Sequence, residues 1–140
     1  PRPRNLTPAD TTSWLPSGGL ADALRPRWPG LEGRLVDGVV PAEEIAALRA
    51  SARDADLVIL GSVNAVGEPS AVELAAALVQ AGRPVVAVAL RAPWDADAYP
   101  EVGTVVATYG IQGPSLAALA DALAGDVPIT GRAPVPVQSA

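Results

Sequence analysis

The sequence predicts an α/β protein, a three-layer sandwich in which a mostly parallel sheet of about five strands carries helices on both faces. First, short apolar runs alternate with segments of helical periodicity along most of the chain. Second, the runs at residues 57–60 and 85–90 are continuously apolar, as in strands that are buried on both faces of a parallel sheet. Third, 140 residues suffice for one domain with a substantial core.

The first part of the chain predicts a lead-in followed by the start of the domain. Residues 1–19 are rich in Pro, Arg, Thr, Ser and Gly and are expected to be a linker, which leaves 20–140 as the domain. A short helix at 20–24 is followed by an expected strand at 34–40. Pro41 then begins a helix to residue 52, since proline is tolerated in the first turn and two glutamates there favour the helix dipole.

The middle of the chain predicts strand, helix and strand. Residues 56–61 form a buried strand, and Pro69 begins a helix with Val72, Ala75, Ala76 and Val79 on its inner face. Gly82 suits the position just past the end of that helix. The strand at 84–90 follows.

The last third continues the alternation. Residues 95–99 are expected to form a helical turn with Asp95 as its cap, 104–108 a short strand, and 114–124 a helix. Further strands are considered near residues 3–7 and at 135–137, the latter only at a sheet edge because of its prolines.

Composition excludes several classes of function. The net charge is −5 and there is no dense basic run, so neither nucleic acid nor a membrane is an expected partner. The chain has no Cys, His or Met, and all its basic residues are Arg, which removes thiolate, imidazole and lysine chemistry. No nucleotide-binding or metal-binding spacing is present, so no cofactor and no metal is expected. The sequence favours a soluble bacterial protein without distinguishing a cytoplasmic from an exported one.

Polar and aromatic side chains follow three of the predicted strands. They are Ser62 and Asn64, then Arg91, Trp94 and Asp95, then Thr108 and Tyr109. In an open parallel sheet, ligands collect beyond the carboxyl ends of the strands, so these residues are candidates for a small-molecule site or a domain interface, or they form a polar cluster that satisfies itself. Arg91 can hold a carboxylate, and a local pair with Asp95 is the favoured partner. Trp94 suits an interface or, less strongly, stacking on a sugar.

An ordered set of segments resembles the C-terminal domain of family 3 glycoside hydrolases, especially the β-N-acetylglucosaminidase branch. The segments are DLVILGSVN at 56–64, ALVQAGRPVVAVALRAPWD at 77–95, YPEV at 99–102, ATYG at 107–110, SLAALADALAG at 115–125 and GRAPV at 131–135. The resemblance covers residues 54–137 well and 6–53 loosely.

This resemblance implies that the catalytic machinery lies elsewhere. In the family, the nucleophilic Asp belongs to a separate N-terminal (β/α)8 barrel, and in this branch an Asp–His pair on that barrel is the acid/base. In the β-glucosidase branch the second domain lends a Glu, and Glu68 is the comparable residue here. A carboxylate before Pro69 at a helix N-terminus is, however, better explained by the stabilisation that the helix dipole gives it.

Two hypotheses for function follow. One is a non-catalytic accessory domain that supports a barrel, in cis or in trans, during hydrolysis of β-linked N-acetylglucosamine or glucose, with a carbohydrate as a further expected partner. The other is a stand-alone α/β module that binds a small polar or anionic ligand at the strand ends.

Overall fold

A computed structural model of the chain describes residues 19–36 and 38–134. Helices and strands alternate, as the sequence predicts. The elements are α1 (Gly19–Leu24), α2 (Ala42–Ala52), β1 (Val58–Ser62), α3 (Pro69–Val79), β2 (Val85–Ala89), the 3₁₀ helix η1 (Pro93–Ala98), β3 (Thr104–Ala107) and α4 (Gly113–Leu123).

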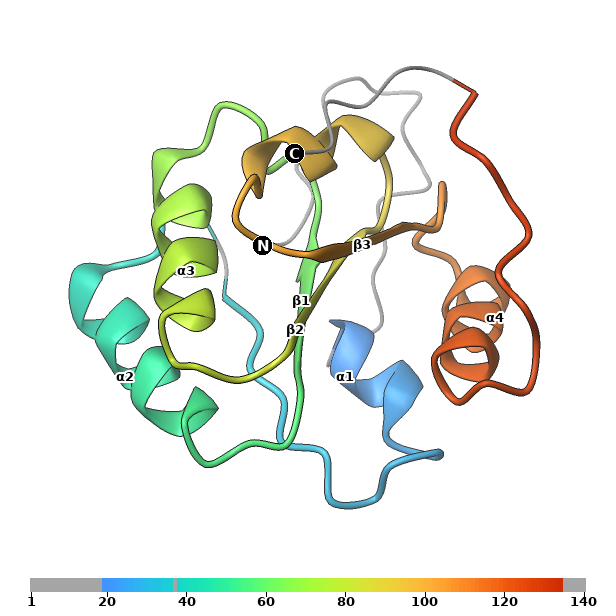
Figure 1. Cartoon of the computed structure of the whole chain (residues 1–140), viewed down its shortest axis with the longest axis horizontal. Coiled ribbons are helices and arrows are strands. Elements are labelled where there is room, and N and C mark those ends of the chain that lie inside the picture. Colours follow the sequence, from blue (N-terminus) through green and yellow to red (C-terminus); the bar gives the residue numbers. More distant parts are fainter. Residues whose placement is uncertain (1–18, 37, 135–140) are drawn as a thin grey trace.

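The sheet is parallel, with the order β1-β2-β3 (Figure 1). Ser62 lies beside Ala89, and Ala89 beside Ala107, so the carboxyl ends of the three strands are level with one another. The predicted class, an α/β fold around a parallel sheet, is confirmed. The residues that directly follow β1, β2 and β3 therefore lie at the same edge of the sheet.

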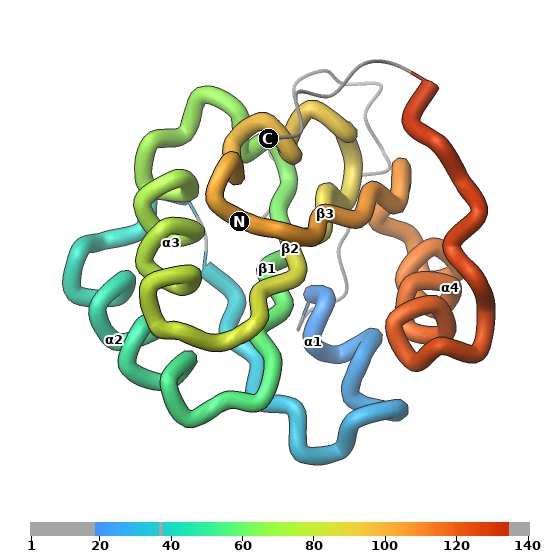
Figure 2. The backbone as a smooth tube through the Cα atoms, viewed as in Figure 1, coloured from blue at the N-terminus to red at the C-terminus, as the bar shows by residue number. Residues whose placement is uncertain are grey.

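Helices cover both faces of this sheet. α2 and α3 lie on one side, and α1 and α4 on the other (Figure 2). Neighbouring strand residues alternate between the layers: Leu60 packs with the residues of α3, whereas Ile59 and Val88 pack in the cluster that contains Leu116 of α4. The core is built from small aliphatic side chains, as the composition predicts.

Gly61 allows α1 to lie close to β1. A Cβ atom at this position would be 3.3 Å from Cδ1 of Leu90 and 2.8 Å from Cδ2 of Leu20, and the second distance is shorter than real Cβ contacts. The glycine in the middle of a buried strand therefore has a packing role, as expected for a strand glycine where another element approaches closely.

The predicted number of strands is wrong for the part of the chain that the structure describes, where the sheet has three strands instead of about five. Of the strand expected at 34–40, the described residues 34–36 and 38–40 have no strand assignment. Gly38 has a left-handed backbone with φ of 73°, and the N–H of Val40 donates to Ser70 Oγ at 3.0 Å rather than to a ladder. The strands considered at 3–7 and 135–137 lie outside the described residues.

Candidate functional site

The carboxyl ends of the strands form one continuous edge of the molecule, here called the strand-end rim. It contains Ser62, Asn64, Arg91, Trp94, Asp95 and Tyr109. All six follow or end a strand, and the level register of the parallel sheet brings their backbones to the same side. The sequence argument expected this convergence. The rim divides into a buried half and an exposed half.

The buried half is a hydrogen-bonded cluster around Asp95. This side chain is only 1% exposed, and Ser62 is 2% exposed. The hydroxyl of Ser62 donates to Oδ2 of Asp95 at 3.0 Å, and the N–H of Ala65 donates to Oδ1 at 2.8 Å. Both carboxylate oxygens thus accept from the segment at the end of β1. A buried carboxylate with such partners is satisfied, and it ties η1 to β1.

One sequence-based expectation for Asp95 is replaced by this geometry. The backbone cap of η1 is Ala92, with no side-chain cap bond, and Asp95 lies inside the helix. The carboxylate accepts from Ser62 and Ala65, and the expected pair with Arg91 stays a prediction. A short 3₁₀ turn points the side chain at position 95 toward the sheet rather than back along the chain.

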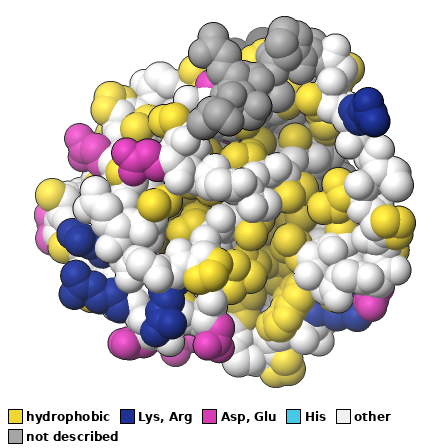
Figure 3. Space-filling model, in the orientation of Figure 1, with side chains coloured by type: hydrophobic (Ala, Val, Ile, Leu, Met, Phe, Trp, Pro, Cys, Tyr) yellow, Lys and Arg dark blue, Asp and Glu magenta, His cyan; other side chains and the backbone are white. Residues whose placement is uncertain are grey.

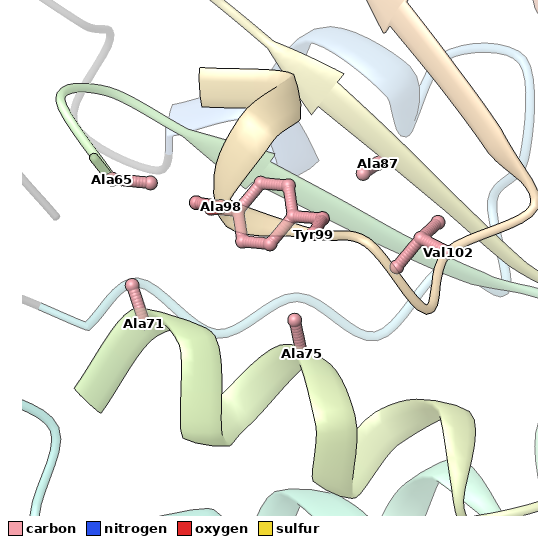
Figure 4. Close-up of a cluster of buried hydrophobic side chains, with 7 residues drawn as sticks. All are labelled: Ala65, Ala71, Ala75, Ala87, Ala98, Tyr99 and Val102. Atoms are coloured by element: carbon pink, nitrogen blue, oxygen red, sulfur yellow. The ribbon is translucent and has the colours of Figure 1, made fainter. Parts of the chain in front are cut away.

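Tyr99 completes the cluster, and the sequence argument missed it. It is 3% exposed, and Figure 4 shows its ring between η1 and the alanines of α3. Burial raises the pKa of Tyr99 to about 12; the nearby Asp95 charge adds to this effect, whereas a hydrogen bond with Ser62 opposes it. The sequence signal that could have pointed to Tyr99 was its position one turn after Asp95.

This raised pKa predicts a loss of stability at alkaline pH. The ordinary tyrosine pKa is near 10 and the folded-state pKa is about 12, so the folded state favours the neutral phenol. The resulting stabilisation is complete below pH 10 and falls as pH rises through 12, by about 2 kcal/mol at pH 11.5. We expect urea denaturation to show this fall in the wild type but not in Tyr99→Phe. Identical pH dependence in both proteins would contradict the assignment.

The exposed half of the rim displays aromatic side chains. Trp94 is 51% exposed and Tyr109 is 50% exposed. Asn64 and Tyr109 both have left-handed backbones, with φ of 59° and 54°, and they are the two non-glycine residues of this kind in the described chain. This conformation is common for Asn, but for a bulky residue such as Tyr109 it is unusual and costs of order 1–3 kcal/mol.

Glu68 has a structural role. It is the N-cap of α3, where its side chain accepts a hydrogen bond from Ser70 N–H at 3.4 Å and from Ser70 Oγ at 2.9 Å. Ser70 Oγ accepts in turn from the N–H of Val40 at 3.0 Å. The carboxylate therefore fixes the start of α3 and, through Ser70, the segment that leads into α2.

Two depressions in the described surface lie away from the rim. One, of about 310 Å³, is at the opposite end of the sheet and is lined by Val79, Arg83, Pro84, Val85, Glu101, Val102, Gly103 and Thr104. The other, of about 360 Å³, lies along residues 34–44. Among the described helices, none is both long and apolar enough to cross a bilayer.

Comparison with known proteins gives two structural relatives. No family model and no curated protein matches the chain. A glycoside hydrolase family 3 β-N-acetylglucosaminidase from Paenibacillus sp. str. FPU-7 matches with a TM-score of 0.75 and 26% identity, over 91% of this chain. A fungal multi-domain GH3 β-N-acetylglucosaminidase, described as having a unique GCN5-related glucosamine N-acetyltransferase region, matches with a TM-score of 0.74 and 24% identity, over 84% of this chain.

The chain spans a minor part of each relative, namely 24% of the bacterial protein and 13% of the fungal one. The resemblance that the ordered segments predicted is confirmed by the bacterial match, which combines a shared fold with sequence identity over nearly the whole chain. The chain is therefore related to family 3 glycoside hydrolases of the β-N-acetylglucosaminidase type, and it corresponds to one region of those larger proteins.

Proposed function

We propose that the chain is an accessory, non-catalytic domain of a family 3 glycoside hydrolase, equivalent to the C-terminal domain of β-N-acetylglucosaminidases. One observation carries this proposal: the chain matches a bacterial GH3 β-N-acetylglucosaminidase over 91% of its own length but over only 24% of that protein. The remainder of such a protein has room for the catalytic barrel that the family resemblance implies. The accessory domain would support hydrolysis of β-linked N-acetylglucosamine or glucose without supplying the reacting groups.

The side chains of this domain fit a supporting role. Glu68, its one catalytic candidate, is engaged as the N-cap of α3. Asp95 is buried and accepts two hydrogen bonds, so its carboxylate does not face solvent. The Asp–His acid/base of the family would have to come from the barrel, since this chain contains no His.

The strand-end rim is the proposed contact surface for the barrel. Trp and Tyr are among the residue types most enriched at the energetically dominant positions of protein interfaces, and the rim presents one of each. Trp94 and Tyr109 are half exposed, while the cluster beneath them holds η1 on β1. Rigid aromatic side chains lose little conformational entropy when they become buried, which favours binding. The alternative, a module that binds a small polar or anionic ligand, would use the same strand ends.

Removal of the Trp94 side chain tests this surface. We expect Trp94→Ala to weaken binding to a separately expressed family 3 β-N-acetylglucosaminidase barrel by about 30-fold or more, as for a central interface tryptophan. Ile129→Ala, at an exposed apolar residue outside the rim, should leave the affinity within about twofold. Isothermal titration calorimetry measures both. Equal affinity of the Trp94 variant and the wild type would place the interface elsewhere.

The non-catalytic assignment has a separate test. The isolated chain should not hydrolyse nitrophenyl β-N-acetylglucosaminide or nitrophenyl β-glucoside at a rate above background. Turnover by the isolated chain that disappears in Glu68→Gln would show that this domain carries an acid/base, and it would overturn the accessory assignment.

A further inference from the structure

The segment that follows β3 carries a residue with a strained backbone. Tyr109 has a left-handed conformation with φ of 54°, although its side chain is bulky. The side chain is 50% exposed, so the domain uses only about half of its surface for its own packing. Residues held in such conformations persist only where the surrounding structure enforces them, and they concentrate at binding sites and switch regions. The position is therefore a candidate for function.

The hydroxyl of Thr108 holds the backbone on both sides of Tyr109. Its Oγ1 donates to the C=O of Gly110 at 2.9 Å and to the C=O of Leu90 at 3.0 Å, so that the two acceptors share one hydrogen. The first contact closes a ring around Tyr109, and the second ties this ring to the end of β2. The N–H of Thr108 also donates to the C=O of Ala89 at 3.0 Å.

The chain is held after Tyr109 as well. A Cβ atom at Gly110 would be 2.7 Å from Oγ of Ser115, so the backbone here lies close against the first turn of α4. Ile111 is 4% exposed and belongs to the core cluster that contains Leu116. Because the residues before and after Tyr109 are fixed, its backbone has little freedom to relax, and the ring is presented in a defined direction.

We propose that Thr108 is a positioning residue for Tyr109, and that the strain tolerated at Tyr109 serves to present its ring to the barrel. This inference rests on the proposed accessory function and adds the reason why the rim is shaped before docking. A side chain that is already held in its bound orientation loses less conformational entropy on association. Higher affinity then accompanies lower stability of the free domain, a common relation at functional sites.

The surroundings of β3 favour an aromatic contact. Figure 3 looks onto this strand and shows apolar side chains gathered between β3, α1 and α4, with most charged groups toward the margins. The segment that leads from β3 into α4 borders this area (Figure 1). Covering a ring with a partner costs less where few charged groups lose water at the same time.

The strain can be measured without a barrel. Tyr109→Ala and Tyr109→Gly both remove the ring, but only glycine adopts a left-handed backbone without penalty. We expect urea denaturation to give a folding equilibrium constant about fivefold larger for Tyr109→Gly than for Tyr109→Ala. At Val72, which is 40% exposed on α3, the order should be reversed, since glycine weakens a helix interior. An alanine variant at position 109 that is as stable as the glycine variant would overturn the inference.

Calorimetric titration with a separately expressed family 3 β-N-acetylglucosaminidase barrel tests the positioning role. Tyr109→Ala should raise the dissociation constant about tenfold or more. Thr108→Val keeps the shape but loses the hydroxyl, and it should raise the constant about fivefold, whereas Thr108→Ser should bind as the wild type does. Thr104→Val makes the same change at the other end of β3, so it is the matched control and should leave the affinity unchanged.

A double variant separates positioning from a general structural role. If Thr108 acts through the ring, Thr108→Val should not weaken binding further when Tyr109→Ala is already present. A full additional loss in the double variant, or wild-type affinity in either single variant, would overturn the inference. Binding that Trp94→Ala weakens but Tyr109→Ala does not would overturn this inference alone, whereas a wild type that does not bind the barrel would overturn the proposed docking as well.

Discussion

Asp95→Ala is expected to lower the free energy of unfolding by about 2–4 kcal/mol, a large part of the stability of a domain this size. The carboxylate is 1% exposed and receives the Ser62 hydroxyl and the Ala65 N–H. Removing it leaves two buried donors without an acceptor, and each costs about 1–3 kcal/mol because no water replaces the lost partner. The connection between η1 and the end of β1 is lost with it.

Urea denaturation of the wild type and three variants measures this effect. Asp97→Ala is the matched control, because this second aspartate of η1 is exposed, and its removal should change stability by no more than about 0.5 kcal/mol. Asp95→Asn should lie between the two, since an amide oxygen still accepts one of the two hydrogen bonds. A loss of less than about 1 kcal/mol in Asp95→Ala would mean that the donors find other acceptors.

The same variants connect stability with docking. If the cluster holds the rim in its binding conformation, Asp95→Asn should bind a barrel domain more weakly than the wild type at a temperature where both are folded. Asp97→Ala should bind as the wild type does. Unchanged affinity in Asp95→Asn would restrict the role of this carboxylate to stability.

The sequence was sufficient to locate β1, β2 and β3, and the reason is their composition. Continuous runs of Val, Leu, Ile and Ala bounded by Gly and Pro have few alternatives to a buried parallel strand. The segment at 34–40 has similar residues, but its described residues 34–36 and 38–40 do not join the sheet, since Ser70 Oγ accepts from the N–H of Val40 and Gly38 turns the backbone. Composition identifies extended segments, whereas pairing depends on where other elements place their donors and acceptors.

Tertiary packing also decided which face of α3 is buried. The buried apolar residues are Ala71, Leu74, Ala75 and Leu78, whereas Val72, expected inside, is 40% exposed. Of the inner face inferred from the sequence, Ala75 is buried and Val79 is partly buried. The alternative face carries two leucines, which pack against the sheet and α2. This face is favoured because leucines bury more apolar area than valines.

The site shows a similar division between what local patterns specify and what the fold adds. Parallel strands with a common register place their carboxyl ends together, so the membership of the rim follows from the strand assignments alone. The hydrogen bond from Ser62 to Asp95 did not follow, because local patterns do not specify contacts between residues that are distant in sequence. The structure brings Ser62, which is 33 positions away, within hydrogen-bond distance.

Leu116→Ala is expected to cost about 3–5 kcal/mol, the largest effect of any single truncation in the α4 layer. Leu116 is 0% exposed and belongs to the cluster of Val63, Val88, Leu90, Ile111 and Leu119, which joins α4 to the sheet. Its truncation removes apolar burial and leaves a cavity. The neighbours cannot easily close it, because Val88 is fixed in the central strand and Val63 in the turn after β1.

Urea denaturation with Leu57→Ala as control separates burial from side-chain chemistry. Leu57 is 46% exposed, so the same truncation there should cost less than about 1 kcal/mol. α4 lies on the face of the sheet and contributes no residue to the strand-end rim, so Leu116→Ala should keep its affinity for a barrel at temperatures where it is folded. A small loss of stability would indicate that α4 packs loosely on β2. A large loss of affinity in the folded variant would instead show that α4 helps to position the rim, and that the docking surface extends further than the strand ends.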